Sequence, residues 1–224
     1  MAANPTRPNI VKDNGCPFCM STVRDLKDMK RYGDLVEVPC RCCGTYRITA
    51  TAIDVLPNWD PEPRLWAAIA YQVRKMTGRA EPPRLDTEVL RALRDTAKLP
   101  HPDQIIEEFV LWTGVHSRWP GDAFDIRFES HRTLLGAVDR GAFDYMVDSI
   151  GESGYFNGTL SKFVDSPSTM LECSLRPHGW NHFRELSAAQ AETRYGFMAM
   201  KYGEAEGGCR GQQPLRAPGA PCGL

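Results

Sequence analysis

The chain has 224 residues, of which 25% are charged and 42% hydrophobic, and its formal net charge is −1. This composition is ordinary for a globular protein, and the length suffices for two domains of common size. Near-neutral charge lacks the overall basic excess typical of nucleic-acid binders. No stretch approaches the roughly 18 apolar residues of a membrane span. Residues 1–8 also lack the apolar core of a signal peptide. We therefore expect a cytoplasmic protein outside the membrane.

Residues 10–56 form the first predicted unit, a small β-rich segment. The runs 35–38 and 46–49 have the composition of short strands, and a cysteine-rich turn lies between them. Four of the eight cysteines of the chain sit in two close pairs within this unit. In a reducing compartment, such pairing indicates metal binding rather than disulfides.

Residues 57–115 form a predicted helical segment. Asp60-Pro61 is a helix-start signal, and the apolar spacing that follows predicts a helix ending near Gly78. Two more helices are predicted, from about Thr87 and over 102–113. We interpret these three helices as a packing layer without chemistry of its own.

Residues 122–192 have the element order of a winged-helix unit: a strand, two helices, a hairpin and a final helix. The predicted elements are a strand at 124–128, helices at about 131–138 and 140–152, a hairpin of 155–156 with 170–175, and a helix from 177 to about 191. Together with the first unit, this predicts an α+β fold.

The C-terminal part of the sequence changes character. Residues 196–202 have the composition of a buried strand, and nothing after them can pair with it. Residues 203–224 are rich in Gly, Pro, Ala and Arg with few bulky apolar side chains, which predicts a disordered tail.

The cysteine pairs predict a structural zinc site. Cys16 and Cys19, and Cys40 and Cys43, are each separated by two residues, a spacing that lets one tight turn direct both sulfurs to a metal. Gly44 permits the left-handed backbone that such a turn needs. Four thiolates leave no open coordination position, so the metal is predicted to be structural. Because so small a unit lacks a hydrophobic core, we expect the metal to supply much of its folding free energy.

Two alternatives remain open for the cysteines. The first alternative is that the cysteines bind no metal and are either free structural cysteines or a redox pair. A redox pair normally stands at a helix N-terminus in a βαβ context, which is not visible here. Cys42 is the second, because it could replace Cys40 or Cys43 as a ligand; the two-residue spacing favours Cys43. Cys173 is interpreted as a buried packing residue.

The sequence carries no recognisable catalytic site. His178 and His182 are one helical turn apart, but the glutamate of a zinc-protease motif is missing between them and Trp180 there has the character of a core residue. Residues 151–154 lack the strand-before-helix context of a nucleophile elbow. We therefore expect that the chain is not an enzyme.

The local distribution of charge argues against DNA binding. Residues 1–56 contain eight Lys or Arg and six Asp or Glu, an excess that the −2 charge of a zinc–tetrathiolate centre would cancel. Over 131–152, which includes the segment expected to enter a groove, two arginines face four acidic residues. Acidic side chains repel phosphates, so a protein partner or an intramolecular domain is favoured. The remaining basic excess lies in residues 74–98, which contain seven Lys or Arg and four Asp or Glu. Such a composition is typical of a solvated helix.

Three motifs together resemble a known group of proteins. They are the two cysteine turns with 38–49, the segment Leu175-Arg176-Pro177-His178-Gly179-Trp180 with Glu185-Leu186, and residues 196–202. They resemble the N-terminal region of bacterial multidomain proteins. In that group a four-cysteine zinc ribbon and a winged-helix-like segment precede a Rossmann-like domain similar to nucleoside 2-deoxyribosyltransferases and Toll/interleukin-receptor-like domains.

The resemblance implies that 196–202 is the first strand of the nucleotide-handling domain and that the catalytic part is missing, as in a truncation or frameshift. We therefore expect a zinc-binding regulatory or protein-interaction module, the remnant of a larger nucleotide-handling protein. The alternative is a zinc-ribbon and winged-helix protein that binds DNA or RNA.

Overall fold

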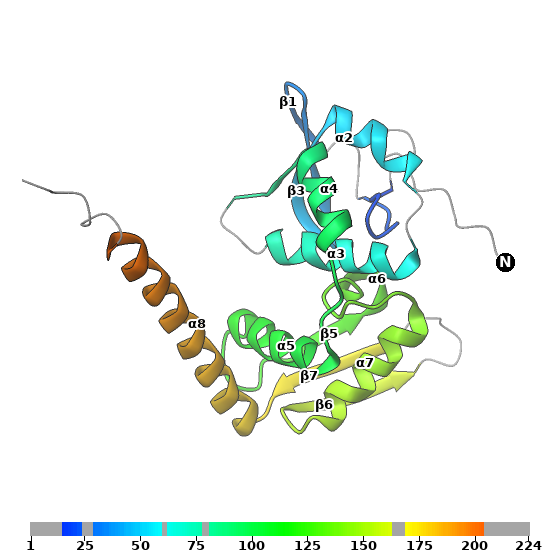
Figure 1. The fold of residues 1–224 in the computed structure, drawn as a ribbon. Helices are drawn as coiled ribbons and strands as arrows, with labels where there is room; N and C mark the ends of the chain where they lie inside the picture. The colour runs from blue at the N-terminus through cyan, green and yellow to red at the C-terminus, as the bar shows by residue number, and fades with distance from the viewer. Residues whose placement is uncertain (1–14, 24–28, 60–61, 78–80, 163–168, 204–224) are drawn as a thin grey trace, which may run out of the picture. The chain divides into compact units, whose positions relative to one another are not determined.

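The structure, a computed structural model, describes residues 15–23, 29–59, 62–77, 81–162 and 169–203 (Figure 1). The chain divides into two compact units, residues 1–184 and 185–224. Helices and strands are mixed, and a small cysteine cluster lies near the N-terminus, which confirms the predicted α+β class. Within the described residues, no helix has both the length and the apolar character needed to cross a membrane.

The first sheet has four strands in the order β1-β2-β3-β4. Both predicted strands are present, as β2 (Leu35–Cys40) and β3 (Gly44–Thr49), and they pair antiparallel. Two short strands at the edges were not predicted. β1 (Lys30–Tyr32) pairs antiparallel with β2, and β4 (Arg84–Leu85) pairs parallel with β3.

Three helices follow or cover this sheet. α2 (Ala50–Val55) begins at Thr49, whose side chain accepts a hydrogen bond from the Ala52 backbone, and it leads into a short 3-10 turn, η2 (Leu56–Asn58). α3 (Pro63–Thr77) contacts β3, and α4 (Thr87–Thr96) contacts both α2 and α3. α4 begins at the predicted residue; the start signal at 60–61 and Gly78 lie outside the described residues.

The cysteines and these helices share one hydrophobic core. Trp66 and Ile69 of α3 and Leu90 of α4 are buried in the same cluster as Tyr46 of β3 and the cysteine turns. The expectation that the cysteine unit lacks a hydrophobic core is therefore wrong. The apolar faces predicted for the helices find their partner in the cysteine-bearing sheet.

A second sheet lies further along the chain, in the order β5-β7-β6 with antiparallel neighbours. Its strands are β5 (Phe124–Arg127), β6 (Phe156–Lys162) and β7 (Thr169–Leu175). α5 (Pro102–His116) packs against β7, α7 (Arg140–Glu152) packs against β6, and the two helices contact each other. The predicted hairpin and the helix at 140–152 are confirmed, and Asp139 caps that helix by accepting from the Ala142 backbone at 2.8 Å.

The helix predicted at 131–138 is wrong. α6 covers only Phe128–His131, and turns follow it up to Gly136. Gly136 has φ +60°, a left-handed conformation that interrupts a right-handed helix. The Ala137 backbone then donates to the carbonyl oxygen of Arg132 instead of continuing the helical ladder.

The strand predicted at 196–202 is also wrong. These residues lie within α8, which runs from Pro177 to Gly203 instead of ending near 191. A strand must find another strand for its backbone hydrogen bonds, whereas a helix satisfies them within its own segment. In the described part of the chain no strand pairs with this segment. The tail predicted as disordered falls, from residue 204 onward, outside the described residues.

Candidate metal centre

Four buried cysteines converge at one point of the first unit. The Sγ atoms of Cys16, Cys19, Cys40 and Cys43 all lie within 4.8 Å of one another. The Cys16–Cys43 distance is 3.9 Å and the Cys19–Cys40 distance is 3.5 Å. A tetrahedron with metal–sulfur bonds of about 2.3 Å has edges of about 3.8 Å. The four sulfurs are therefore close enough together to coordinate one metal ion.

The first cysteine turn is closed by backbone hydrogen bonds. The Met20 N–H donates to the Cys16 carbonyl at 2.7 Å, and the Cys16 N–H donates to the Ser21 carbonyl at 2.9 Å. An isolated bridge between Gly15 and Thr22 continues this short hairpin. The turn requires φ +58° at Met20, the one positive φ of a non-glycine residue in the described ranges.

The second turn joins β2 to β3, and the sheet register sets it. Cys40 pairs with Gly44 at the end of the ladder, and Gly44 has φ +79° as the sequence predicted. The Cys43 N–H lies 3.4 Å from Cys40 Sγ and donates to it. Such an N–H···S bond stabilises a thiolate, the form that binds a metal.

Cys42 is not a member of the four-sulfur group. Its thiol donates to the Glu129 carbonyl oxygen at 2.8 Å, and its sulfur lies 3.2 Å from Ser21 Oγ. The Cys42 carbonyl accepts a hydrogen bond from Thr133. The neighbouring Cys19 sulfur raises the pKa of Cys42, which keeps it a protonated donor. The geometry thus places Cys43, and not Cys42, in the four-sulfur group.

If all four cysteines of the cluster are deprotonated, they need a cation between them. Burial raises the pKa of Cys16 and of Cys43, whereas hydrogen bonds from Cys16 and Cys40 lower the pKa of Cys19. Four thiolates cannot share one buried site without a positive charge between them, because like charges at this distance repel strongly. A divalent metal supplies that charge and displaces the thiol protons.

Tyr46 supports the cluster from β3. Its hydroxyl lies 3.2 Å from Cys16 Sγ, and its fully buried ring meets Phe18 edge-on, with ring centroids 5.3 Å apart. Burial raises the pKa of Tyr46, so the hydroxyl keeps its proton and can donate it to a Cys16 thiolate. Tyr46 was predicted only as a strand residue; its inward place in the period-two pattern of β3 was the available signal.

His178 and His182 form a different arrangement from a metal pair. Both rings stack on Tyr155, with centroid distances of 5.3 and 4.7 Å. Neither belongs to a metal-binding group in the part of the chain that the structure describes. Cys173 is buried, as predicted, and burial raises its pKa to about 12.

Comparisons of the chain with protein-family models, with curated proteins and with solved structures find no match. The assignment of this site therefore depends on its own geometry: four buried cysteines placed close enough to coordinate one metal ion.

Proposed function

We propose that the chain is a zinc-dependent regulatory or protein-interaction module in which Cys16, Cys19, Cys40 and Cys43 hold a structural Zn²⁺. The observation that carries this proposal is the closed group of four buried sulfurs. Zn²⁺ accepts four thiolates tetrahedrally, whereas Mg²⁺ and Ca²⁺ prefer oxygen ligands. With all four positions filled by protein, no site remains for water or substrate, which favours a structural role.

The metal would also organise the contact between the cysteine turns and residues 129–133, which lie between β5 and α7. Arg132 donates to Ser21 Oγ at 3.1 Å, Ser21 contacts Cys42, and Cys42 donates to the Glu129 carbonyl. These bonds connect both cysteine turns with residues 129–133. Occupancy of the site should therefore affect this neighbouring segment as well as the turns themselves.

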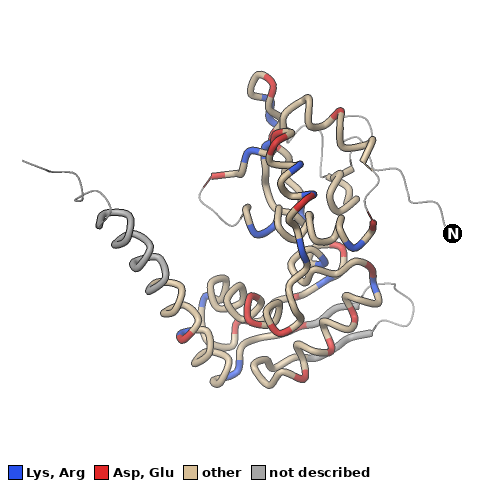
Figure 2. Tube along the Cα trace, in the orientation of Figure 1, with Lys and Arg blue, Asp and Glu red and all other residues tan. Residues whose placement is uncertain are grey.

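The elements from α5 to β7 support a winged-helix assignment. Helix, strand, short helix, helix and two paired strands follow in that order, and the sheet order is β5-β7-β6. In this interpretation α7 is the helix that would enter a DNA groove. Its exposed side chains include Asp148 and Glu152, and its one cation, Arg140, pairs with Glu129 at 3.2 Å. Acidic positions recur along α7 in the Cα trace (Figure 2). An acidic α7 supports a protein partner over DNA.

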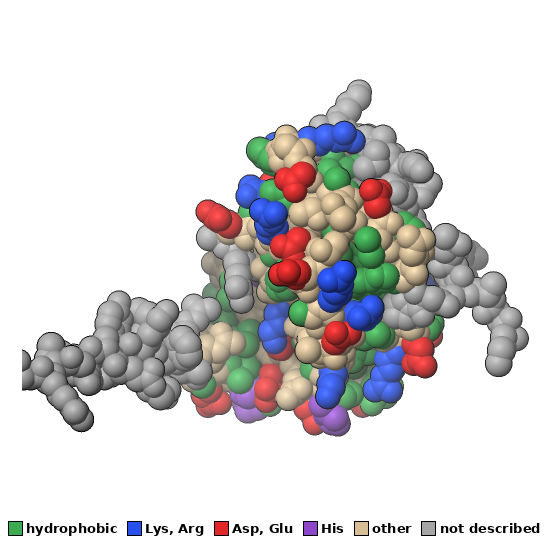
Figure 3. Space-filling view, turned by 45° about the horizontal axis from the view of Figure 1, so that its top comes forward, with side chains coloured by type: hydrophobic (Ala, Val, Ile, Leu, Met, Phe, Trp, Pro, Cys, Tyr) green, Lys and Arg blue, Asp and Glu red, His purple; other side chains and the backbone are tan. Residues whose placement is uncertain are grey.

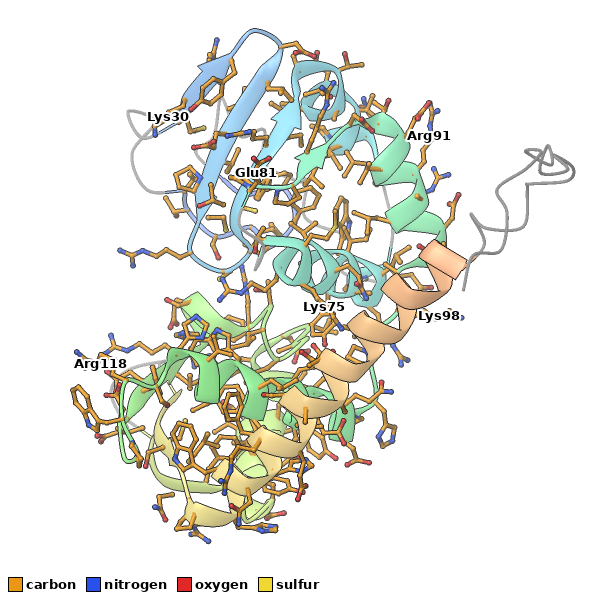
Figure 4. The ribbon with its side chains drawn as sticks, turned by 90° about the vertical axis from the view of Figure 1, so that its left-hand side faces the viewer. Lys30, Lys75, Glu81, Arg91, Lys98 and Arg118 are labelled. Carbon is orange, nitrogen blue, oxygen red and sulfur yellow. The ribbon has the colours of Figure 1, made fainter. Side chains whose placement is uncertain are left out.

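Several of the described cations outside α7 are separated from one another or paired with acidic groups. Arg91 and Lys98 are exposed but separated along α4 and the segment after it (Figure 4). Lys75 pairs with Glu108 at 2.6 Å. Figure 3 shows basic and acidic side chains interspersed on one face. Binding of DNA or RNA is therefore the alternative function. The proposal that the chain derives from a larger nucleotide-handling protein depends on the sequence resemblance alone.

Metal analysis of the full chain, purified under reducing, anaerobic conditions, tests the proposal. We expect one zinc per chain, loss of the metal in Cys16→Ser, and retention in Cys173→Ser, whose cysteine is also buried but lies outside the cluster. Zinc near zero in the unmodified chain would overturn the proposal.

Fluorescence anisotropy with labelled duplex and single-stranded DNA or RNA tests the alternative. A phosphate-dominated complex forms at low salt, at about 50 mM, and weakens steeply as salt rises. Such binding by the zinc-loaded chain would favour the nucleic-acid function; its absence at low salt would exclude it.

A further inference from the structure

A pocket opens beside the first cysteine turn. Its volume is about 180 Å³, and its walls come from the first cysteine turn, α3 and the turns after α6. Phe18 and Trp66 are buried apolar walls, and Met20 and Val138 are exposed at 39% and 37%. The pocket therefore has apolar walls beside polar ones, and its rim is accessible from solvent.

Arg132 is the one Lys, Arg, Asp or Glu among the lining residues, and Cys19, one of the four clustered cysteines, lines the pocket as well. Its Nη2 donates to Ser21 Oγ at 3.1 Å, and its guanidinium lies 5.1 Å from the Phe128 ring centroid. Among the described residues, no carboxylate lies within ion-pair distance of it. Within the described residues, these two contacts hold the guanidinium while most of its five N–H donors remain available.

Arg140 shows what a compensated arginine looks like nearby. Its guanidinium lies over the same Phe128 ring, at 5.0 Å, but it pairs with Glu129 at 3.2 Å and does not line the pocket. Thr133, which does line the pocket, donates its hydroxyl to the Cys42 carbonyl and has no further proton to offer. Arg132 is therefore the group that an anionic ligand would meet.

We propose that this pocket binds a small carboxylate whose body is a single aromatic ring or a branched aliphatic chain. The carboxylate pairs with Arg132, and the apolar body contacts Phe18, Trp66 and Met20. A guanidinium fork matches a carboxylate through two parallel hydrogen bonds. An apolar cavity of about 150 Å³ holds one benzene ring, so a pocket of 180 Å³ fits one ring with its acid group. This inference goes beyond the proposed function.

Phenylacetate is the probe, and benzyl alcohol is its uncharged counterpart. Titration of the zinc-loaded, ¹⁵N-labelled full chain to about 10 mM covers the affinity expected for a ligand of this size. The chain has five tryptophans. We expect a saturable shift of the Trp66 indole resonance, identified with Trp66→Phe, and at least tenfold weaker binding of benzyl alcohol. No saturable shift with phenylacetate, or equal binding of the alcohol, would overturn the proposal.

Arg132→Gln and Arg140→Gln form the matched pair of variants. We expect Arg132→Gln to weaken phenylacetate binding at least tenfold while benzyl alcohol binds as before, and Arg140→Gln to leave both unchanged. Ala67→Phe should abolish binding by filling the pocket from α3, with Arg132 intact. Retained binding in both Arg132→Gln and Ala67→Phe would place the ligand elsewhere and refute the site.

Metal content measured on the same samples separates this proposal from the zinc centre. If a chain purified without metal bound phenylacetate, the pocket proposal would be supported and the proposed zinc function would be refuted. One zinc per chain without phenylacetate binding would refute the pocket alone.

Discussion

The Thr77 hydroxyl lies 2.9 Å from the Cys43 carbonyl oxygen, so the last residue of α3 contacts the second cysteine turn directly. The same hydroxyl is 2.7 Å from the Arg74 carbonyl of its own helix. A Cβ at Gly44 would lie 2.2 Å from Thr77 Oγ1 and 2.8 Å from Thr77 Cβ. Glycine at this position therefore allows the second cysteine turn and α3 to approach each other.

Gly44→Ala should destabilise the protein by more than about 2 kcal/mol, because it combines left-handed strain with a steric clash. Gly33→Ala is the matched control, since Gly33 also has positive φ (+63°) but nothing lies within 4 Å of its Cβ position. That control should lose only about 1 kcal/mol. Denaturant unfolding of the zinc-loaded chains measures both values. Equal losses would show that the Thr77 contact is unimportant.

Met20→Gly should raise the free energy of unfolding by up to about 1 kcal/mol, because glycine adopts φ +58° without strain. The Met20 side chain is 39% exposed, so its removal costs part of this gain. Met20→Ala removes the same side chain but keeps the strain, and the Gly-minus-Ala difference isolates the backbone effect. A glycine variant less stable than the alanine variant would contradict the prediction.

The features that the sequence predicted correctly depend on local signals. The spacing of Cys16-Cys19 and Cys40-Cys43 predicts two turns, and the structure brings their four sulfurs together. The starts of α4 and α7 follow from residues next to them: Asp86 and Asp139 each accept backbone hydrogen bonds from the first helical turn. These signals need no knowledge of the rest of the chain.

The features that the sequence missed depend on distant contacts. Arg132 and Ser21 are 111 positions apart, and Cys42 and Glu129 are 87 apart. The two-residue strand β4 exists only because it pairs with β3, and its Arg84–Leu85 sequence carries no strand signal of its own. Local spacing favours Cys43 over Cys42 as a ligand, but no local pattern indicates that the Cys42 thiol bonds to the distant Glu129 carbonyl.

Cys42→Ala should retain one metal per chain and lose about 1–3 kcal/mol of stability, because the Glu129 carbonyl then loses its donor. Cys42→Ser supplies a hydroxyl donor at the same place and should recover part of the loss. Metal analysis and denaturant unfolding test both variants. If Cys42→Ser lost the metal and Cys43→Ser retained it, Cys42 rather than Cys43 would be the ligand.

Tyr46→Phe should weaken metal affinity by about tenfold or more, because it removes the hydroxyl 3.2 Å from Cys16 Sγ while the buried ring remains. Tyr71→Phe removes a comparable hydroxyl that donates to Glu108, outside the cysteine cluster. Competition with a chromophoric chelator measures the affinity of both variants. The Tyr71 variant should bind metal as the unmodified chain does; an equal weakening in both would mean that Tyr46 acts only through general stability.

Acid should destabilise the fold through His131. Burial lowers the pKa of His131 to about 4 from an ordinary value of 6.5; the backbone contact with Arg127 and the charge of Asp125 oppose this shift, and the positive charges of Arg74 and Arg127 add to it. The Arg127 N–H donates to His131 Nδ1 at 3.1 Å, which requires the neutral ring. The unfolded chain therefore binds the proton more readily than the folded one. This stabilising contribution is fully present above pH 6.5 and is lost as the pH falls toward 4.

The loss amounts to about 2–3 kcal/mol at most. His131→Gln does not titrate in this range, so its stability should fall less than that of the unmodified chain between pH 7 and 4.5. Acid also protonates the cysteines and releases metal in both chains. The quantity to compare is therefore the difference between the two unfolding free energies at each pH, measured with zinc in excess. A difference that stays constant over this range would show that His131 does not sense the proton.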